Sequence, residues 1–232
     1  MATYLYISLI GLLFCLSACK QTTAEKPLTK TIVDTPKLQS VFINGDSIHY
    51  MDVGRGEPVV FVHGSLGDYR SWGAQVDTFS KHHRVITYSR RYAQPNKQVL
   101  NDSADYSVLI HSKDLAALIK SLNLGPVHLV GHSWGAFTAL KTTIDNPELV
   151  KTLVLGEPPV HSLIENTKIG DSLLNDLEEN TFKPSAKAFL QSDNLGGITL
   201  FIGGVMGDSL AYSKAPEFVQ ERWNKNFLEL RG

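Results

Sequence analysis

The segment 131–135, Gly-His-Ser-Trp-Gly, holds Ser133 between two glycines in the spacing G-x-S-x-G. A serine hydroxyl is a weak nucleophile at its own pKa, and it attacks acyl carbons when a histidine held by a carboxylate takes its proton. The residues before the motif, 127–130, are apolar and typical of a strand, and those from Phe137 onward have helical spacing. In that context the motif predicts a sharp strand-to-helix turn that exposes the Ser133 hydroxyl. A glycine-rich turn without chemistry is the alternative.

The predicted turn also places the backbone N–H of Trp134 at the start of a helix, where it can stabilise an oxyanion. A second turn, His63-Gly64-Ser65, follows another apolar run at 58–62. The serine turn is expected to expose its hydroxyl at the carboxyl end of the sheet.

These two turns make the chain similar to the α/β-hydrolase fold family over roughly residues 40–232. The resemblance implies that the backbone N–H of Ser65 is the second oxyanion donor, with Leu66 as the next candidate. It also implies the chain order serine, acid, histidine, so His63 is interpreted as a turn-stabilising residue, with a base as the alternative.

One histidine, His161, follows Ser133 in the sequence, and three acids lie between them. Asp145 and Glu148 are expected at a helix end remote from the turn. Glu157 follows a strand and is the candidate acid, because Glu157 and His161 have the right chain order.

Pro158 and Pro159 argue against a compact triad of Ser133, Glu157 and His161, since four extended residues span about 13 Å. The resemblance implies that the acid and the base follow the last two strands, beyond a helical cap. The sequence therefore predicts that this chain is truncated at its carboxyl end and lacks those last strands, and that Ser133 reacts only slowly in it.

The loop after the strand at 84–88 carries Arg90 and Arg91 where similar proteins often have an Asp-Arg-Gly turn. Structural salt bridges are the favoured interpretation of both arginines, and binding of an anionic substrate group is the alternative.

Strands alternate with helices over residues 40–160, which predicts an α/β fold with a mostly parallel sheet. The expected elements are a hairpin over 41–53, strands over 58–62, 84–88, 127–130 and 149–155, and helices over 72–79, 108–122 and 137–144.

Residues 161–232 are predicted to form a helical cap, since their apolar residues recur with helical spacing. Two glycine pairs, Gly196-Gly197 and Gly203-Gly204, are expected to break these helices. The cap is expected to determine substrate specificity.

Residues 1–18 are predicted to be a signal peptide, because an uncharged apolar run ends in small residues. The sequence Leu16-Ser17-Ala18-Cys19 resembles the lipobox of bacterial lipoproteins, which implies a lipid on Cys19 and a place on the cell envelope facing away from the cytoplasm. An uncleaved transmembrane anchor is the alternative. Residues 19–39 are expected to be a tether between the membrane and the folded domain.

A formal net charge of -1 argues against a nucleic-acid-binding protein. Two cysteines, Cys15 and Cys19, cannot form a disulfide framework, and no cluster has metal-ligand spacing.

The leading hypothesis is a serine hydrolase of small-molecule esters or related acyl compounds, which needs no cofactor. A non-catalytic binding protein is the alternative, and within the fold haloperoxidase-like or carbon–carbon bond hydrolase activity uses the same serine turn.

Overall fold

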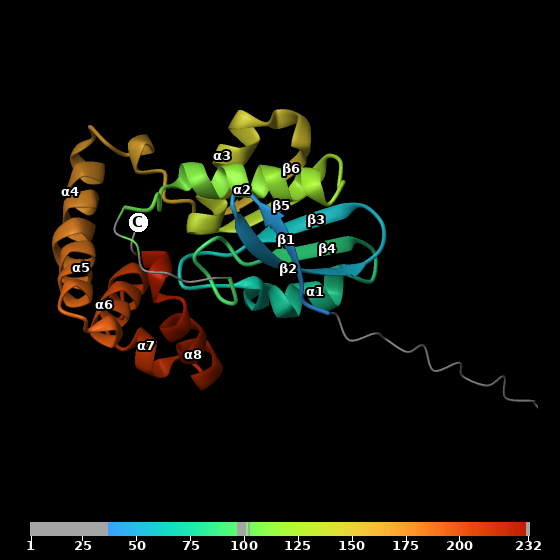
Figure 1. Ribbon diagram of the computed structural model, residues 1–232. Helices are drawn as coiled ribbons and strands as arrows, with labels where there is room; N and C mark the ends of the chain where they lie inside the picture. The colour runs from blue at the N-terminus through green and yellow to red at the C-terminus, as the bar shows by residue number, and fades with distance from the viewer. Residues whose placement is uncertain (1–36, 97–100, 102, 231–232) are drawn as a thin grey trace, which may run out of the picture. The chain divides into compact units, whose positions relative to one another are not determined.

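A computed structural model describes residues 37–96, 101 and 103–230, and residues 35–232 form one compact unit. Its centre is a six-stranded sheet in the order β1-β2-β4-β3-β5-β6 (Figure 1). The strands are β1 (Gln39–Ile43), β2 (Asp46–Gly54), β3 (Pro58–Val62), β4 (Arg84–Tyr88), β5 (Val127–His132) and β6 (Val150–Gly156). The pairs β1/β2 and β2/β4 are antiparallel, and the other three pairs are parallel. The predicted α/β fold with a mostly parallel sheet is confirmed.

The apolar run of β3 is continuous because both faces of the sheet are covered. Val60 and Val62 belong to one core cluster, with residues of α2 (Val108–Ser121) and α3 (Trp134–Asp145). Val59 and Phe61 belong to a second cluster on the opposite face, together with Val76 of α1 (Gly73–Phe79). Figure 1 shows α2 and α3 on one side of the sheet and α1 on the other.

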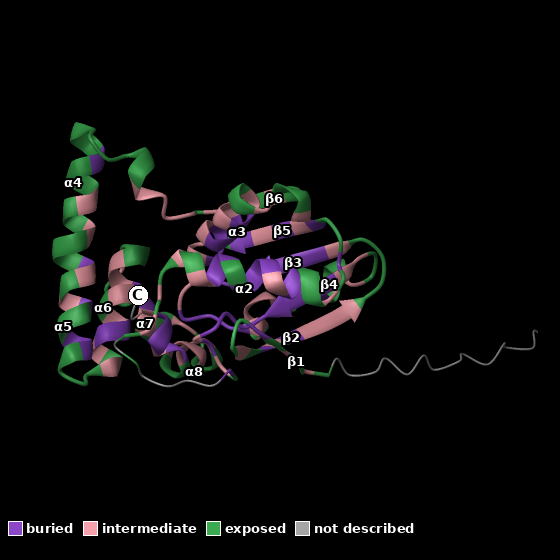
Figure 2. Ribbon diagram, turned by 45° about the horizontal axis from the view of Figure 1, so that its top comes forward, coloured by how far each residue is buried: buried purple, intermediate pink, exposed green. Residues whose placement is uncertain are grey.

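The cap follows β6 and consists of helices and single helical turns. Its elements are η3 (His161–Leu163), α4 (Lys168–Leu177), the π-helical turn η4 (Glu178–Phe182), α5 (Lys183–Leu190), α6 (Asn194–Met206), α7 (Ala211–Lys214), α8 (Glu217–Lys225) and η5 (Phe227–Leu230). Two short 3-10 turns, η1 (Tyr69–Trp72) and η2 (Pro147–Leu149), lie outside the cap, in the part of the chain that forms the sheet. Figure 2 shows the burial concentrated in the sheet, whereas α4 is mostly exposed. The cap has its own apolar cluster, which includes Leu66 from the loop after β3.

The prediction that the glycine pairs break the cap helices is wrong, because α6 runs without interruption from Asn194 to Met206. These glycines allow close contact with neighbouring elements. A Cβ on Gly197 would lie 2.8 Å from the ring of Phe189, and one on Gly204 would lie 2.0 Å from Oγ1 of Thr181. The helix ends at Gly207, whose φ of 64° gives the left-handed cap that favours glycine.

The predicted signal peptide, Cys19 and nearly all of the predicted tether lie outside the described residues. Among the helices that the structure does describe, none has both the length and the apolar character needed to cross a membrane.

Candidate active site

Ser133 lies on a sharp turn between β5 and α3, where its φ is 52° and its ψ is -126°. Positive φ is uncommon for a residue with a side chain and costs about 1–3 kcal/mol. The turn is held by a hydrogen bond of 2.7 Å from the Ser133 N–H to the carbonyl oxygen of Gly156 in β6. This geometry is the strand-to-helix turn expected from the sequence.

The flanking glycines are required because other backbone segments approach them closely. A Cβ on Gly135 would lie 2.3 Å from the carbonyl oxygen of His63, and one on Gly131 would lie 2.6 Å from Cα of Ala136. Such distances exclude any larger residue at either position without movement of the backbone.

The His63-Gly64-Ser65 turn packs directly on the serine turn. A Cβ on Gly64 would lie 3.1 Å from Cβ of Ser133, so a larger residue would require one of the two turns to shift by a few tenths of an ångström. Ser65 borders the same cavity as Ser133 and Trp134, whereas Leu66, the other candidate, is fully buried against the cap. The structure thus brings together the serine and both residues predicted to supply oxyanion donors.

The cavity has a volume of about 440 Å³ and lies between the two turns and the cap. Its walls are largely aromatic and aliphatic, with a few polar residues. The lining residues are Ser65, Tyr106, Ser133, Trp134, Pro159, His161, Glu178, Phe182, Ser185, Ala186, Phe189, Phe201, Val205, Glu229 and Leu230. A cavity of this size and character accommodates a small organic molecule.

Glu157 and His161 are described residues, and no hydrogen bond or ion pair joins them. The Glu157 side chain is 87% exposed, and its carboxylate lies 3.5 Å from Nε2 of His132. His161 does border the cavity, where its ring stacks on Phe182 at 6.5 Å between centroids. The structure therefore places the candidate base near Ser133 without the candidate acid.

The other two acids considered from the sequence lie at the far end of α3. Asp145 is its last residue and pairs with Lys141 at 2.5 Å, and Glu148 is exposed in η2. Neither borders the cavity.

His63 is buried and has both ring nitrogens engaged. Its Nδ1–H donates to the carbonyl oxygen of Gly64 at 2.8 Å, and its Nε2 accepts from the backbone N–H of Arg90 at 2.9 Å. Burial, together with the Arg90 charge, lowers the pKa of His63 to about 3. A neutral ring with no free nitrogen stabilises the turn and cannot take the serine proton.

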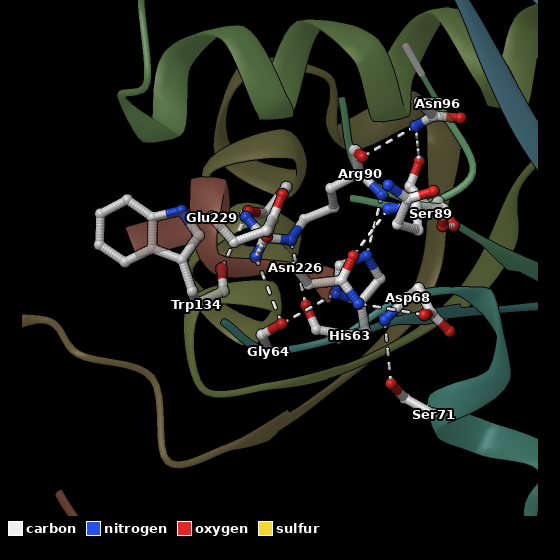
Figure 3. Close-up of polar contacts among 12 residues, drawn as sticks. His63, Gly64, Asp68, Ser71, Ser89, Arg90, Asn96, Trp134, Asn226 and Glu229 are labelled. Carbon is white, nitrogen blue, oxygen red and sulfur yellow. Dashed lines mark hydrogen bonds and ion pairs between the residues drawn. The ribbon is translucent and has the colours of Figure 1, made fainter. Parts of the chain in front are cut away.

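Both arginines after β4 form buried or half-buried ion pairs. Arg91 binds Asp114 through two hydrogen bonds of 2.6 and 2.8 Å. Arg90 pairs through Nη2 with Glu229 of η5, and this same nitrogen lies 3.3 Å from the carbonyl oxygen of Gly64 (Figure 3). Structural salt bridges, the favoured interpretation, account for both side chains.

Three polar residues around the turn were not identified from the sequence. Asp68, whose side chain is fully buried, binds Arg70 at 2.6 Å and accepts a hydrogen bond of 3.1 Å from Asn226. Glu229 has no exposed side-chain surface, and burial raises its pKa to about 7 despite the Arg90 charge. A charged residue inside the apolar run 227–230 is the one sequence signal that could have marked Glu229.

A model of the family described as alpha/beta hydrolase fold matches residues 57–193. The chain belongs to the α/β-hydrolase fold family. The matched part contains Ser65, Ser133 and Trp134, and it also contains Glu157 and His161. Helices α6, α7 and α8 and the turn η5 follow it.

Two curated hydrolases share sequence with the chain. It is 32% identical over 117 residues to the (E)-2-((N-methylformamido)methylene)succinate hydrolase of Acinetobacter baylyi, covering 48% of this chain and 41% of that protein. It is 28% identical over 140 residues to an uncharacterized hydrolase of Bacillus subtilis, covering 60% of this chain and 51% of that protein. The chain thus spans about half the length of these relatives.

A solved structure of an epoxide hydrolase from Bacillus megaterium superimposes with a TM-score of 0.65. The likeness covers 83% of this chain and 70% of that chain, at 21% sequence identity. At this identity the likeness concerns the fold.

Proposed function

We propose that the protein hydrolyses esters or related acyl compounds of small size, with Ser133 as the nucleophile. The observation that carries this proposal is the positive φ of Ser133 on a turn that borders a cavity shared with Ser65 and Trp134. In an α/β-hydrolase such a turn presents the hydroxyl to the substrate, and nearby backbone N–H groups stabilise the tetrahedral oxyanion.

In the proposed reaction Oγ of Ser133 bonds to the acyl carbon and gives its proton to a base. The alcohol leaves with a proton, and water then releases the acid from the acyl-enzyme. Among the histidines that the structure describes, His161 is the one that borders the cavity, so it is the first base to test. Because no carboxylate of the described residues forms a hydrogen bond or an ion pair with His161, we expect slow rather than rapid acylation.

The test is labelling of the 232-residue chain by a fluorophosphonate probe, with hydrolysis of a chromogenic butyrate ester in parallel. We expect weak labelling that Ser133→Ala removes, because removal of triad members leaves only about 10³–10⁴-fold catalysis over water. Ser185→Ala is the matched control, since Ser185 also borders the cavity but its hydroxyl donates to the carbonyl oxygen of Gly197 at 2.8 Å. Equal labelling of Ser133→Ala and the unaltered chain would contradict the proposal.

Rapid labelling would show that a base does reach Ser133, and loss of that rate in His161→Ala would assign the role to His161.

The second candidate function is binding without turnover. It is favoured by one observation, that no described histidine forms a hydrogen bond with Ser133. Tight binding of an ester that remains intact, unaffected by Ser133→Ala, would support it.

We also propose that a lipid on Cys19 anchors the protein to the bacterial cell envelope, facing away from the cytoplasm. The support is the lipobox-like sequence 16–19 after an apolar run. We expect Cys19→Ala to accumulate as an unprocessed precursor, whereas Cys15→Ala, the control, is processed normally. Mass spectrometry of the mature protein with residues 1–18 retained and Cys19 unmodified would favour a transmembrane anchor.

A further inference from the structure

The direction of the proposed oxyanion donor depends on one peptide group. The N–H of Ser65 and the C=O of Gly64 belong to the same planar peptide, so they point in opposite directions. Any contact that fixes the carbonyl oxygen of Gly64 therefore fixes the direction of the Ser65 N–H.

The carbonyl oxygen of Gly64 is held by three donors. It accepts hydrogen bonds from Nδ1 of His63 at 2.8 Å, from the backbone N–H of Gly67 at 3.2 Å and from Nη2 of Arg90 at 3.3 Å. The first two donors belong to the turn itself. Arg90 comes from the loop after β4 and also donates from Nε to the carbonyl oxygen of His63 at 3.2 Å, so it bridges two successive carbonyls.

Arg90 is held in turn by Glu229, which lies 139 positions later in the sequence. The Arg90 and Glu229 side chains are 1% and 0% exposed, and Nη2 of Arg90 contacts both Glu229 and Gly64 (Figure 3). Loss of the carboxylate would leave a buried guanidinium without a counter-charge, which favours its movement toward water.

Two polar atoms of this pair have no partner among the described residues, namely Nη1 of Arg90 and Oε1 of Glu229. Beyond the ion pair itself, Arg90 donates to the two carbonyls of the oxyanion turn, and the Glu229 carboxylate interacts with the backbone N–H of Tyr92.

We propose that Glu229 and Arg90 are positioning residues, through which the last turn of the cap sets the direction of the Ser65 N–H in the oxyanion site. This inference rests on the proposed function, because it assumes that Ser65 N–H binds the oxyanion. It connects the cap, which encloses the substrate, to the group that stabilises the transition state.

The first experiment monitors the environment of the Ser65 N–H without any substrate. In ¹⁵N–¹H spectra of the chain, we expect Glu229→Gln and Arg90→Lys to shift the Ser65 amide resonance and to speed its hydrogen exchange. Asp114→Asn is the matched control, since it also removes the carboxylate of a buried arginine pair, on Arg91, but does not contact the turn. An unchanged Ser65 resonance in both variants would overturn the proposal.

The second experiment measures oxyanion binding with an alkyl trifluoromethyl ketone. Oγ of Ser133 bonds to the carbonyl carbon, the π pair moves to the oxygen, and the hydroxyl proton goes to solvent. We expect Glu229→Gln to weaken the binding of this ketone at least ten-fold, since loss of one oxyanion donor costs about 10²–10³ in rate. The matching secondary alcohol, which forms no adduct, should bind within two-fold of its affinity for the unaltered chain.

An equal loss of affinity for the ketone and for the alcohol would mean that Glu229 only maintains the shape of the cavity. That result would overturn the proposal. If Glu229→Gln does not fold, Glu229→Asp replaces it, since it keeps the charge and withdraws it from Arg90 by one methylene. Failure of the unaltered chain to bind the ketone would contradict the proposed function, and the Ser65 resonance would then still decide the positioning role.

Discussion

At the level of single residues, the sharp turn that carries Ser133 depends on three glycines that allow other parts of the chain to approach it closely. Gly64, Gly131 and Gly135 each lie against another backbone segment or against Ser133 itself. The strain of a positive φ is offset by the hydrogen bond from Ser133 to Gly156 and by the packing of α3 on the sheet. His63, which lies beside the serine turn, contributes through its hydrogen bonds rather than through proton transfer.

The neutral state of His63 makes the folded protein sensitive to acid. Its pKa is about 3 in the folded state and about 6.5 when unfolded, so the unfolded chain binds more protons between these values. Stability from this group is complete above pH 6.5 and is lost as the pH falls toward 3. We expect about 2 kcal/mol of lost unfolding free energy at pH 5, at about 1.4 kcal/mol per pKa unit.

Urea denaturation from pH 5 to 7 checks this expectation. His63→Asn should reduce the pH dependence by that amount, because it removes the titrating group from both states. His132→Asn is the control, since the His132 side chain is 55% exposed. An identical pH dependence in His63→Asn and the unaltered chain would contradict the assignment.

At the element scale, α6 is the helix whose glycines have a packing role. Glycine costs about 1 kcal/mol relative to alanine inside a helix, so their presence needs a tertiary reason. That reason is the approach of η4 and α5, because Gly204 lies against Thr181 and Gly197 against Phe189. The close packing of these elements forms one wall of the cavity.

We expect Gly204→Ala to destabilise the protein by about 1–3 kcal/mol, since overpacking outweighs the gain in helix propensity. Gly73→Ala in α1 is the matched control, because nothing lies within 4 Å of a Cβ at that position. It should leave stability unchanged or raise it by up to about 1 kcal/mol. Equal midpoints of denaturation for both variants would show that α6 does not need its glycines.

At the scale of the whole molecule, the sheet has two outer strands, β1 and β6. Within the described residues no strand pairs with the outer edge of β6, where Val154 is 55% exposed. An open edge with an exposed apolar side chain favours pairing with another chain. The opposite edge carries Phe42 of β1, which is 73% exposed.

We expect the 232-residue chain to self-associate as its concentration rises, and Val154→Lys to reduce that association, since an edge lysine opposes strand pairing. Sedimentation velocity measures the change. Phe42→Lys tests the other edge in the same way and should have the smaller effect, because β1 is an antiparallel strand five residues long. Unchanged association in Val154→Lys would exclude the β6 edge as the contact.

Features that depend on local backbone geometry could be predicted from the amino-acid sequence. The glycines around Ser133, the Asn44-Gly45 turn with both φ angles positive, and the apolar runs of β3 and β4 all act over a few residues. Local patterns of this kind specify a turn or a strand directly, because the allowed backbone conformations of each residue type are limited. The serine motif predicted the turn itself and the Trp134 N–H, whereas the Ser65 N–H was expected from the resemblance to the α/β-hydrolase fold family.

The pairing of polar groups, in contrast, depends on how distant parts of the chain pack together. Glu157 pairs with His132 rather than with His161, and Arg90 pairs with Glu229 across 139 positions. Local periodicity contains no information about such partners, because they depend on how the cap folds back on the core. The glycine pairs of α6 show the same limit: a glycine that breaks an isolated helix is retained in a packed one, where it allows a neighbouring chain to approach.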